Sequence, residues 1–424
     1  MSDTIYALSS GALPAAIGII RISGPAAGSA LASLAGGLPP ERTPVVRKLR
    51  DHGGDTLDVA LVLWFPGRRT ATGEDLVELH CHGGRAVVAA VLNALAAIPG
   101  LREAEPGEFT RRAFLNGRVD LAEAEGLGDL LSAETELQRR GAMQAAGGAV
   151  SRRIDEWRSR VLVLAAAVEA VIDFADEDDV AALPDDFTAK VAELACEIRQ
   201  VAARPEAERL RDGVRVVLAG PPNAGKSSLF NALLSDDAAI VTDVAGTTRD
   251  VLERPIALGG VPFILIDTAG VRDEGAEAIE AMGIERARRE IAEGHIVLWL
   301  GAPADAPGGS IVIRAKADLD DSSDLGDGQA VSVVTGLGLP ELIDTLIDRG
   351  RGVLPPVDRI GFNRRQKQCA LEAAACLDQV DIRTDLLIAA ENLRLARSAL
   401  DRLVGRDSTE EMLDALFGQF CIGK

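Results

Sequence analysis

Residues 214–228 constrain the fold more than any other stretch of this chain. A short run rich in valine and leucine ends at Gly220, and a segment with leucine and phenylalanine at helical spacing follows the loop. Gly220, Gly225, Lys226 and Ser227 complete the pattern G-x-x-x-x-G-K-[ST], which requires a strand before it and a helix after it. Glycines let main-chain amides surround an anion, and the helix N-terminus adds unpaired donors. The stretch therefore predicts a nucleotide phosphate site, with Lys226 on the β- and γ-phosphates and Ser227 on a magnesium ion.

Two further motifs extend this site. Asp267 ends a second apolar run, where its carboxylate can hold magnesium through water, and Gly270 can offer its N–H to a γ-phosphate. Residues 246–250, Gly-Thr-Thr-Arg-Asp, lie between the two runs, where a switch loop would place a threonine hydroxyl on the metal. Each motif alone is weak, but their order and spacing after the phosphate loop predict a GTPase domain.

A third motif concerns the base. Residues 315–318, Ala-Lys-Ala-Asp, resemble the N-K-x-D signature with which GTPases read guanine, and Asp318 can accept two hydrogen bonds from the base edge. Ala315 stands at the usual asparagine position. The loop that contacts the base, residues 315–318 and called the base loop below, therefore lacks one polar side chain that normally stabilises it. The link between strands expected at 296–300 and 311–313 is also too short for the helix of a normal parallel crossover. We therefore expect an abbreviated nucleotide domain that binds guanine nucleotide more weakly than related GTPases.

One catalytic group is missing from its common place. Val271 follows residues 267–270, where many GTPases have a glutamine that orients water. Hydrolysis then requires another charge stabiliser and another residue that positions water, and the nearby carboxylate of Glu280 is the candidate.

Length and composition bound the rest of the molecule. The chain of 424 residues, 47% of them hydrophobic, is long enough for two or three domains with sizeable cores. It has no apolar run of membrane-spanning length, no signal-like N-terminus and no C-x-x-C pair among five cysteines, so we expect a cytoplasmic protein with reduced thiols and no membrane partner. The net charge of −20 disfavours binding of nucleic acid unaided. An RNA partner would require a local basic patch or the help of another protein.

The pattern divides the chain into four segments. Residues 1–118 alternate short β-like runs with turns and predict an α+β domain. Residues 119–210 and 351–424 have helical periodicity and flank the nucleotide domain at 211–350. Two helical blocks around a complete α/β unit indicate that the GTPase domain is inserted into one helical domain. The individual elements expected are strands at 17–22, 59–65 and 76–79 and helices at 85–97, 366–380, 385–404 and 408–417.

Two short motifs leave alternatives open. His80 and His82 flank Cys81 on an expected strand, but no third or fourth ligand is evident, so a packed or hydrogen-bonded pair is favoured over zinc. The chain ends in residues 420–424, Phe-Cys-Ile-Gly-Lys. A thiol and a cation after a structured helix indicate either a tail delivered into a site or a frayed terminus.

These residues together resemble the tRNA modification GTPase MnmE (TrmE) family from end to end. The resemblance rests on the nucleotide motifs and on long motifs outside them, at residues 18–24, 72–75, 82–84, 106–117 and 420–424. It implies a multidomain α/β and α+β protein. Its parts would be an N-terminal α+β folate-binding domain that forms a homodimer, a split all-α domain and an inserted P-loop GTPase domain.

The resemblance also implies the site residues. GTP or GDP is expected to contact Asn223, Ala224, Gly225, Lys226, Ser227, Ser228, Thr242, Asp243, Val244, Ala245, Gly246, Thr247, Thr248, Asp267, Thr268, Ala269, Gly270, Lys316 and Asp318. The implied metal ligands are Ser227 and Thr248 for Mg²⁺, and Asn223, Thr242, Val244 and Thr247 for a K⁺ ion that replaces an arginine finger. Glu280 would position water. A tetrahydrofolate derivative, in the 5,10-methylene or 5-formyl form, is expected near Arg21, Glu78, Arg118 and Lys424, with Cys421 beside it as a candidate catalytic thiol.

The family implies a reaction and partners. Its members use a tetrahydrofolate one-carbon unit to add a (carboxymethyl)aminomethyl group to C5 of the wobble uridine of tRNA. They do so in a hetero-oligomer with the flavoprotein MnmG (GidA), which carries the FAD and would supply most of the tRNA contact. Two alternatives remain: a regulatory GTPase switch without one-carbon chemistry, and a degenerate relative that acts as a dimeric folate-binding scaffold. A pure switch has no use for the folate residues, whereas Ala315 and the short link are what a degenerate relative would have.

Overall fold

The computed structural model describes residues 3–173, 182–235, 240–241, 252–268, 285, 288–319, 328–355, 361–383 and 385–423. The chain forms two compact units, unit 1 with Met1–Gly128 and Val404–Lys424 and unit 2 with Asp129–Leu403. The first boundary between the units falls within α4 (Leu121–Ser132). The four domain ranges expected from the sequence stay a prediction.

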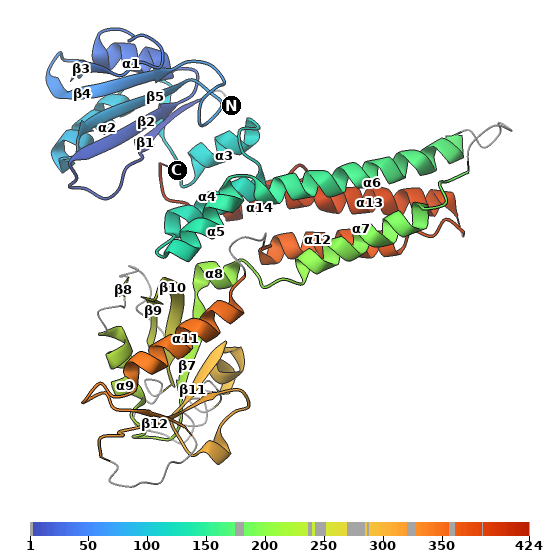
Figure 1. Cartoon of the computed structure of the whole chain (residues 1–424). Helices are drawn as coiled ribbons and strands as arrows, with labels where there is room; N and C mark the ends of the chain where they lie inside the picture. Colours follow the sequence, from blue (N-terminus) through green and yellow to red (C-terminus); the bar gives the residue numbers. More distant parts are fainter. Residues whose placement is uncertain are drawn as a thin grey trace. The chain divides into compact units, whose positions relative to one another are not determined.

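Unit 1 is organised around a six-stranded sheet with the order β3-β4-β5-β2-β1-β6. The strands are β1 (Thr4–Leu8), β2 (Ile17–Ser23), β3 (Val45–Arg50), β4 (Thr56–Phe65), β5 (Leu76–His82) and β6 (Leu101–Glu103). The helices α1 (Ala27–Ala35) and α2 (Arg85–Ala96) cover one face of it (Figure 1), where Leu31 and Val91 join Ile20 and Ile22 in a single buried cluster. The strands predicted at 17–22, 59–65 and 76–79 and the helix at 85–97 correspond to β2, β4, β5 and α2.

The register of the sheet determines which side chains lie on its opposite face. Ile20 and Ile22 of β2 point toward α1 and α2, so the alternating residues Ile19 and Arg21 point away from them. Antiparallel partners share a face, and β5 sets Glu78 opposite Arg21 and His80 opposite Ile19. Polar residues separated by 57 positions in the chain are thereby brought together on one surface.

A buried ionic network joins the sheet of unit 1 to α3 (Glu108–Leu115). The side chain of Arg112 is fully buried, and its guanidinium contacts three carboxylates, those of Asp3, Glu74 and Glu108, at 3.0, 3.1 and 3.0 Å. Burial alone would raise the pKa of Glu108, but hydrogen bonds from Arg102, from the main chain of Glu105 and from Arg112 outweigh it and hold the pKa below its usual value. The charge of the buried Arg112 is thus compensated within unit 1.

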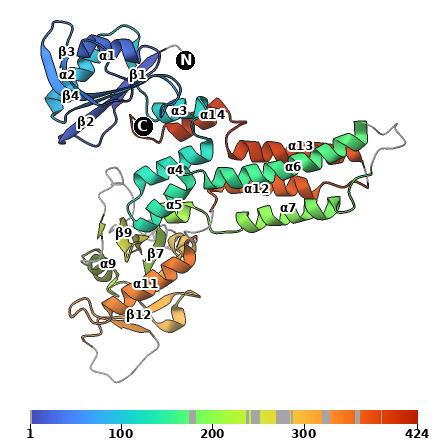
Figure 2. The same cartoon turned by 45° about the horizontal axis from the view of Figure 1, so that its top comes forward.

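Unit 2 contains long helices that come from both sides of the nucleotide segment. These are α5 (Glu136–Ala146), α6 (Ala149–Asp173), α7 (Phe187–Ala202), α12 (Arg364–Asp378) and α13 (Leu386–Leu403). α6 packs on α13 and α7 packs on α12, so early and late segments of the chain lie side by side in one bundle (Figure 2). No helix in the described ranges combines the length and the apolar character that crossing a membrane requires. α12 and α13 match the helices predicted at 366–380 and 385–404, and α14 (Glu410–Phe417), which belongs to unit 1, matches the helix at 408–417.

The nucleotide segment forms a seven-stranded sheet with the order β13-β12-β11-β7-β10-β9-β8. The strands are β7 (Val214–Ala219), β8 (Ile240–Val241), β9 (Leu252–Leu258), β10 (Val261–Asp267), β11 (Ile296–Trp299), β12 (Ile311–Ala315) and β13 (Gln329–Val331). β7 pairs in parallel with β10 and β11, whereas β9 is antiparallel to β10. In such a sheet, ligands bind at the carboxyl ends of the parallel strands.

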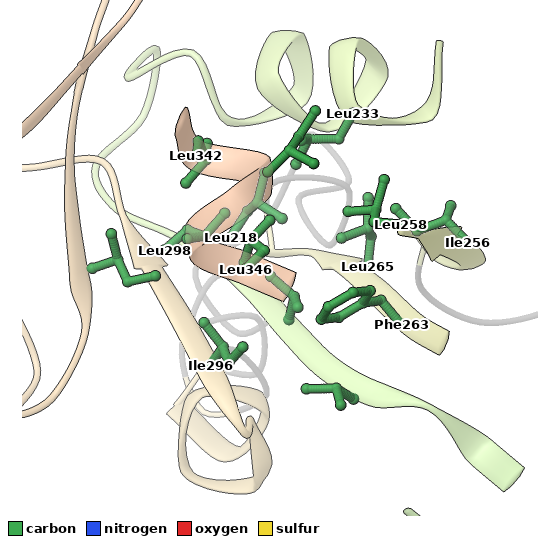
Figure 3. Close-up of a cluster of buried hydrophobic side chains, with 14 of the residues drawn as sticks. Leu218, Leu233, Ile256, Leu258, Phe263, Leu265, Ile296, Leu298, Leu342 and Leu346 are labelled. Atoms are coloured by element: carbon green, nitrogen blue, oxygen red, sulfur yellow. The ribbon is translucent and has the colours of Figure 1, made fainter. Parts of the chain in front are cut away.

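One face of this sheet packs on α9 (Lys226–Leu234) and α11 (Leu339–Val353). Figure 3 shows Leu218, Phe263 and Leu298 of the central strands against Leu233 of α9 and Leu346 of α11. Near-continuous apolar runs in β7 and β10 suit strands that are buried on both faces. This core holds the end of β7 and the start of α9 in place.

The connection between β11 and β12 is short, as the sequence predicts. The two strands pair in parallel, yet residues 300–310 between them contain one 3₁₀ turn, Pro303–Asp305, and no α-helix. The indole N–H of Trp299 donates to the carbonyl of Ala302 at 2.9 Å and closes the turn onto the strand end. The nucleotide domain is abbreviated at this crossover.

We predict that acid destabilises unit 1 through the Arg112 network. For Asp3 and Glu108, arginine contacts outweigh burial and hold the pKa values below the ordinary 3.8 and 4.5. Their contribution to stability is therefore present above the unfolded-state pKa values and is lost as the pH falls through the folded-state values. The urea midpoint of unit 1 should fall between about pH 5 and about pH 3.

Arg112→Met should lower the free energy of unfolding of unit 1 at neutral pH by about 3 kcal/mol and flatten part of this pH dependence, because Asp3, Glu74 and Glu108 lose the buried cation that they share, although Arg102 still pairs with Asp3 and Glu108. The chain has three tryptophans, so a Trp157→Phe, Trp299→Phe background leaves Trp64 fluorescence to report unit 1 alone. Arg50→Met, at an exposed arginine of β3 in unit 1, is the control. An unchanged pH profile in Arg112→Met would contradict the prediction.

Candidate functional site

The phosphate loop has the strand–loop–helix context that its pattern requires. It leaves β7 at Ala219, turns through positive φ angles at Gly220 (143°), Asn223 (60°) and Gly225 (97°), and enters α9 at Lys226. A Cβ at position 220 would lie 2.7 Å from the carbonyl oxygen of Leu300, so only glycine fits this close approach. Gly225 is the N-cap of α9, and it aims the first amides of the helix into the loop.

Three polar side chains converge behind this loop. Lys226 is 6% exposed, and its ammonium donates to the carbonyls of Gly220 at 3.0 Å and Pro221 at 2.8 Å. The Ser227 hydroxyl donates to the carboxylate of the fully buried Asp267 at 2.7 Å. A hydroxyl and a carboxylate oxygen at this distance form a donor set that suits a hard cation such as Mg²⁺. Thr268 lies beside them, with its hydroxyl bonded to the carbonyl of Leu218 at 2.8 Å.

The base loop is braced in two ways. Lys316, with a φ of 60°, donates through Nζ to the carbonyl of Asn223 at 3.2 Å, which ties the base loop to the phosphate loop. Asp318 accepts a hydrogen bond from the Ser332 hydroxyl at 2.6 Å. Ala315 approaches the phosphate loop, since a Cβ added at Gly225 would meet the Ala315 Cβ at 3.5 Å.

Ser332 is a site residue that the motif analysis missed. It is fully buried directly after β13, and its oxygen also accepts the main-chain N–H groups of Val334 and Thr335 at 3.3 and 3.2 Å. These two donors orient the hydroxyl toward Asp318. The available signal was a serine at the end of a short apolar run, followed by Val-Val-Thr-Gly.

On the folate side, the structure brings together two of the predicted residues. Arg21 Nε donates to Glu78 Oε1 at 2.9 Å, and the other oxygen of Glu78 lies 3.3 Å from His80 Nε2, so His80 is a further member of this group. The Arg118 guanidinium donates to the carbonyl of Thr70 at 3.1 Å. No described contact joins Arg118 to the Arg21–Glu78 pair.

The two histidines are hydrogen-bonded to separate carboxylates, as the sequence favours. His80 contacts Glu78, and His82 Nδ1 lies 2.7 Å from Asp58 Oδ1. Cys81 points to the opposite, buried face, where burial and the Asp58 carboxylate raise the pKa of its thiol to about 12. A thiol that resists deprotonation is a poor metal ligand.

The C-terminal tail is ordered against unit 1. Cys421 is exposed, its carbonyl accepts the N–H of Gly107 at 3.4 Å, and Ile422 forms an antiparallel bridge with Pro106. Of the other predicted site residues, Ala224 lies in the phosphate loop and packs on the core of the domain, and Ser228 lies in the first turn of α9. The rest lie outside the described ranges: Thr242, Asp243, Val244, Ala245, Gly246, Thr247, Thr248, Ala269, Gly270, Glu280 and Lys424. Their proposed roles stay predictions.

Known proteins match the chain along its full length. Family models described as "GTP-binding protein TrmE N-terminus" and "MnmE helical domain" match residues 4–118 and 121–421. The tRNA modification GTPase MnmE of Erythrobacter litoralis is 57% identical over 423 residues and is covered completely, as is this chain. The chain belongs to the tRNA modification GTPase MnmE family. The MnmE protein of Novosphingobium aromaticivorans is 54% identical over 437 residues, again with complete coverage of both chains.

Membership confirms the family, the multidomain fold class with a P-loop domain, and the enzyme class, a GTPase of tRNA modification, that the sequence predicts. Among solved structures, the G domain of the T. maritima FeoB iron transporter matches with a TM-score of 0.23 and 24% identity, covering 32% of this chain and 98% of that chain.

We predict that Ser332→Ala weakens GTP binding about tenfold, because Asp318 loses the hydrogen bond that orients it toward the base. Ser310→Ala is the matched control, since the Ser310 hydroxyl bonds the carbonyl of Pro307 at 2.7 Å, at the other end of β12. Titration with a fluorescent guanine nucleotide measures both variants. Equal affinities for the two would show that Ser332 does not position Asp318.

Proposed function

We propose that this chain hydrolyses GTP as part of a cytoplasmic tRNA-modifying complex that adds a (carboxymethyl)aminomethyl group to C5 of the wobble uridine. The main support for the proposal is the phosphate loop, in which the Ser227 hydroxyl bonds the Asp267 carboxylate. The chain that contains this loop matches MnmE proteins over its whole length. A tetrahydrofolate one-carbon unit would be the donor. A flavoprotein of the MnmG (GidA) type would carry the FAD and bind most of the tRNA, which suits a net charge of −20.

The nucleotide site would work through two cations. Ser227 and Thr248 would hold Mg²⁺ on the phosphates, with Asp267 behind Ser227. Asn223, Thr242, Val244 and Thr247 would hold K⁺, which offsets the charge that grows between the β- and γ-phosphates. Of these four, Asn223 lies in the described part of the loop, at its left-handed turn. Glu280 would position the attacking water.

The folate site would use the Arg21–Glu78 pair. A carboxylate suits the N–H donors of a pterin and an arginine suits the acidic tail of a folate, and the two side chains are 30% and 18% exposed, which leaves them accessible. Arg118 and Lys424 would add further cations, and Cys421 would lie beside the one-carbon unit.

A homodimer through unit 1 is supported by the sheet face that carries this pair. A row across the sheet, Ile19–His80–Leu61–Val46, lies opposite the face that α1 and α2 cover. Val46 is 60% exposed, and on the same face Ile17 is 54% exposed. A second copy of this sheet would bury such apolar side chains in a twofold contact.

Reconstitution tests the proposed reaction. The chain, a flavoprotein partner, undermodified tRNA, 5,10-methylene-tetrahydrofolate, glycine or ammonium, and GTP are combined, and the uridine is analysed by mass spectrometry. Modification should require both folate and GTP. Folate binding without GTP turnover would favour the scaffold alternative, and turnover without folate binding would favour the regulatory switch.

We predict that GTP turnover falls at least about tenfold when sodium replaces potassium at constant ionic strength, because the smaller ion fits the proposed ligands poorly. Asn223→Gly should abolish most of this difference, since glycine keeps the left-handed turn and removes the amide ligand. Asn231→Gly, an exposed asparagine on α9, is the control. Phosphate release measures turnover. The same rate in both salts would rule out the potassium site.

A further inference from the structure

Four arginines of unit 1 lie around one loop, residues 66–75, which connects β4 to β5. Arg68 and Arg69 belong to the loop itself. Arg42 Nη2 donates to the carbonyl of Arg69 at 2.7 Å, and Arg118 Nε donates to the next carbonyl of the loop at 3.1 Å. All four residues are exposed. We call Arg42, Arg68, Arg69 and Arg118 the arginine cluster.

The arginine cluster lacks acidic partners. Within the part of the chain that the structure describes, no carboxylate forms an ion pair with any of its members. The two acids of the loop are engaged elsewhere, because Glu74 pairs with the buried Arg112 at 3.1 Å and Asp75 accepts a main-chain N–H of the loop at 2.6 Å. By contrast, Arg102 and Arg111 each pair with two acids. The cluster therefore keeps its positive charge in a chain whose net charge is −20.

Buried contacts hold the loop that carries the cluster. Thr70 is 6% exposed, and its hydroxyl donates to the carbonyl of Glu74 at 2.6 Å. Thr72 is 2% exposed, and its hydroxyl lies 2.7 Å from that of Ser23 at the end of β2. The side-chain amide of Asn116 donates to the carbonyl of Thr72 at 2.8 Å. Arginines on a loop that is held in this way lose less conformational freedom when they bind an anion.

The register of the sheet places the cluster next to the Arg21–Glu78 pair. Leu63 of β4 is the register partner of Glu78. Phe65 follows two residues later, so its ring lies on the same face, about 7 Å further along the strand. The Arg42 guanidinium lies over this ring, 5.7 Å from its centroid. The cluster thus begins on the face that carries the candidate folate residues.

The chemistry of the cluster suits a chain of carboxylates. A guanidinium is planar and can donate two parallel hydrogen bonds to one carboxylate, which an ammonium cannot do. A folate can carry a tail of γ-linked glutamates, and each additional glutamate adds one carboxylate. We propose that the arginine cluster binds the poly-γ-glutamate tail of a reduced folate whose pterin lies at the Arg21–Glu78 pair. This inference rests on the proposed function and names the form of folate that the site selects.

RNA is the other polyanion of the proposed reaction. Binding along an RNA backbone requires a basic surface that spans many phosphates. The arginine cluster is confined to one loop and its two neighbours, Arg42 and Arg118, and it adjoins the candidate folate face. Its extent and its position therefore favour the folate tail.

Calorimetric titration with two ligands tests the proposal. One ligand is 5-formyl-tetrahydrofolate with a single glutamate, and the other is the pentaglutamate form of the same folate. The parent protein should bind the pentaglutamate form about tenfold more tightly at low ionic strength. This preference should shrink at high ionic strength, because salt screens exposed charges.

Two variants and a matched control locate the preference. The double variant Arg68→Ala, Arg69→Ala and the single variant Arg42→Asn should each lose most of it, with the affinity for the monoglutamate changed less than about twofold. Asparagine is used at position 42 because the φ there is 56°, in the left-handed region that asparagine tolerates. Arg50→Ala removes an exposed arginine that bonds the carbonyl of Gly54 at the opposite end of β3, and it should keep the full preference. Binding of the monoglutamate also shows that each variant is folded.

The outcomes separate the proposal from the function on which it rests. Equal affinity of the parent for the two folates would overturn the proposal and leave folate binding in place. A preference that survives in both variants would overturn the assignment to the arginine cluster. No binding of either folate would reject the folate function together with the proposal. Weaker tRNA binding in the double variant than in Arg50→Ala, with the pentaglutamate preference intact, would assign the cluster to RNA instead.

Discussion

The hydrogen bond between the Ser227 hydroxyl and the Asp267 carboxylate is the contact on which the nucleotide site depends. It joins the first turn of α9 to the end of β10, and so it connects two elements that are 40 residues apart in the chain. The geometry behind it is that of a parallel pair, in which β7 and β10 end at the same edge of the sheet. The Ser227 hydroxyl or the Asp267 carboxylate alone would bind a cation poorly, because a hard cation needs several oxygen ligands in one place.

The same sheet shows how a shortened domain can keep a base-reading loop. The crossover from β11 to β12 has no helix, and Ala315 lacks the amide of the usual asparagine. Two contacts hold the loop: Lys316 bonds the phosphate loop at Asn223, and Ser332 orients Asp318 from β13. The degenerate-relative interpretation depends on the loss of such bracing, and in this chain the base loop retains it.

Local patterns allowed most elements and the phosphate loop to be predicted, because strand, turn and helix signals act over a few residues. The helix predicted at 408–417 is an example: it forms as α14, and the side chain of its N-cap, Thr409, accepts the Met412 N–H at 3.4 Å. Contacts set by sheet register were harder to find. Arg21 meets the Glu78–His80 pair of β5 only because β2 pairs with β5 in this register, and Ser332 meets Asp318 only because β13 pairs with β12. A single sequence does not show which residues face each other across two strands. Individual site residues could therefore be predicted, but the contacts between them could not.

The two units use one structural device for different purposes. α9 and α3 each begin after a left-handed glycine, Gly225 and Gly107, a backbone conformation that other residues rarely adopt. At Gly225 the amides are directed to where phosphates would bind. At Gly107 the N–H already has its acceptor, the carbonyl of Cys421. The start of α3 thus binds a segment of its own chain in the way that the start of α9 would bind a ligand. Because that acceptor is covalently attached, its position is set by folding and does not depend on the nucleotide.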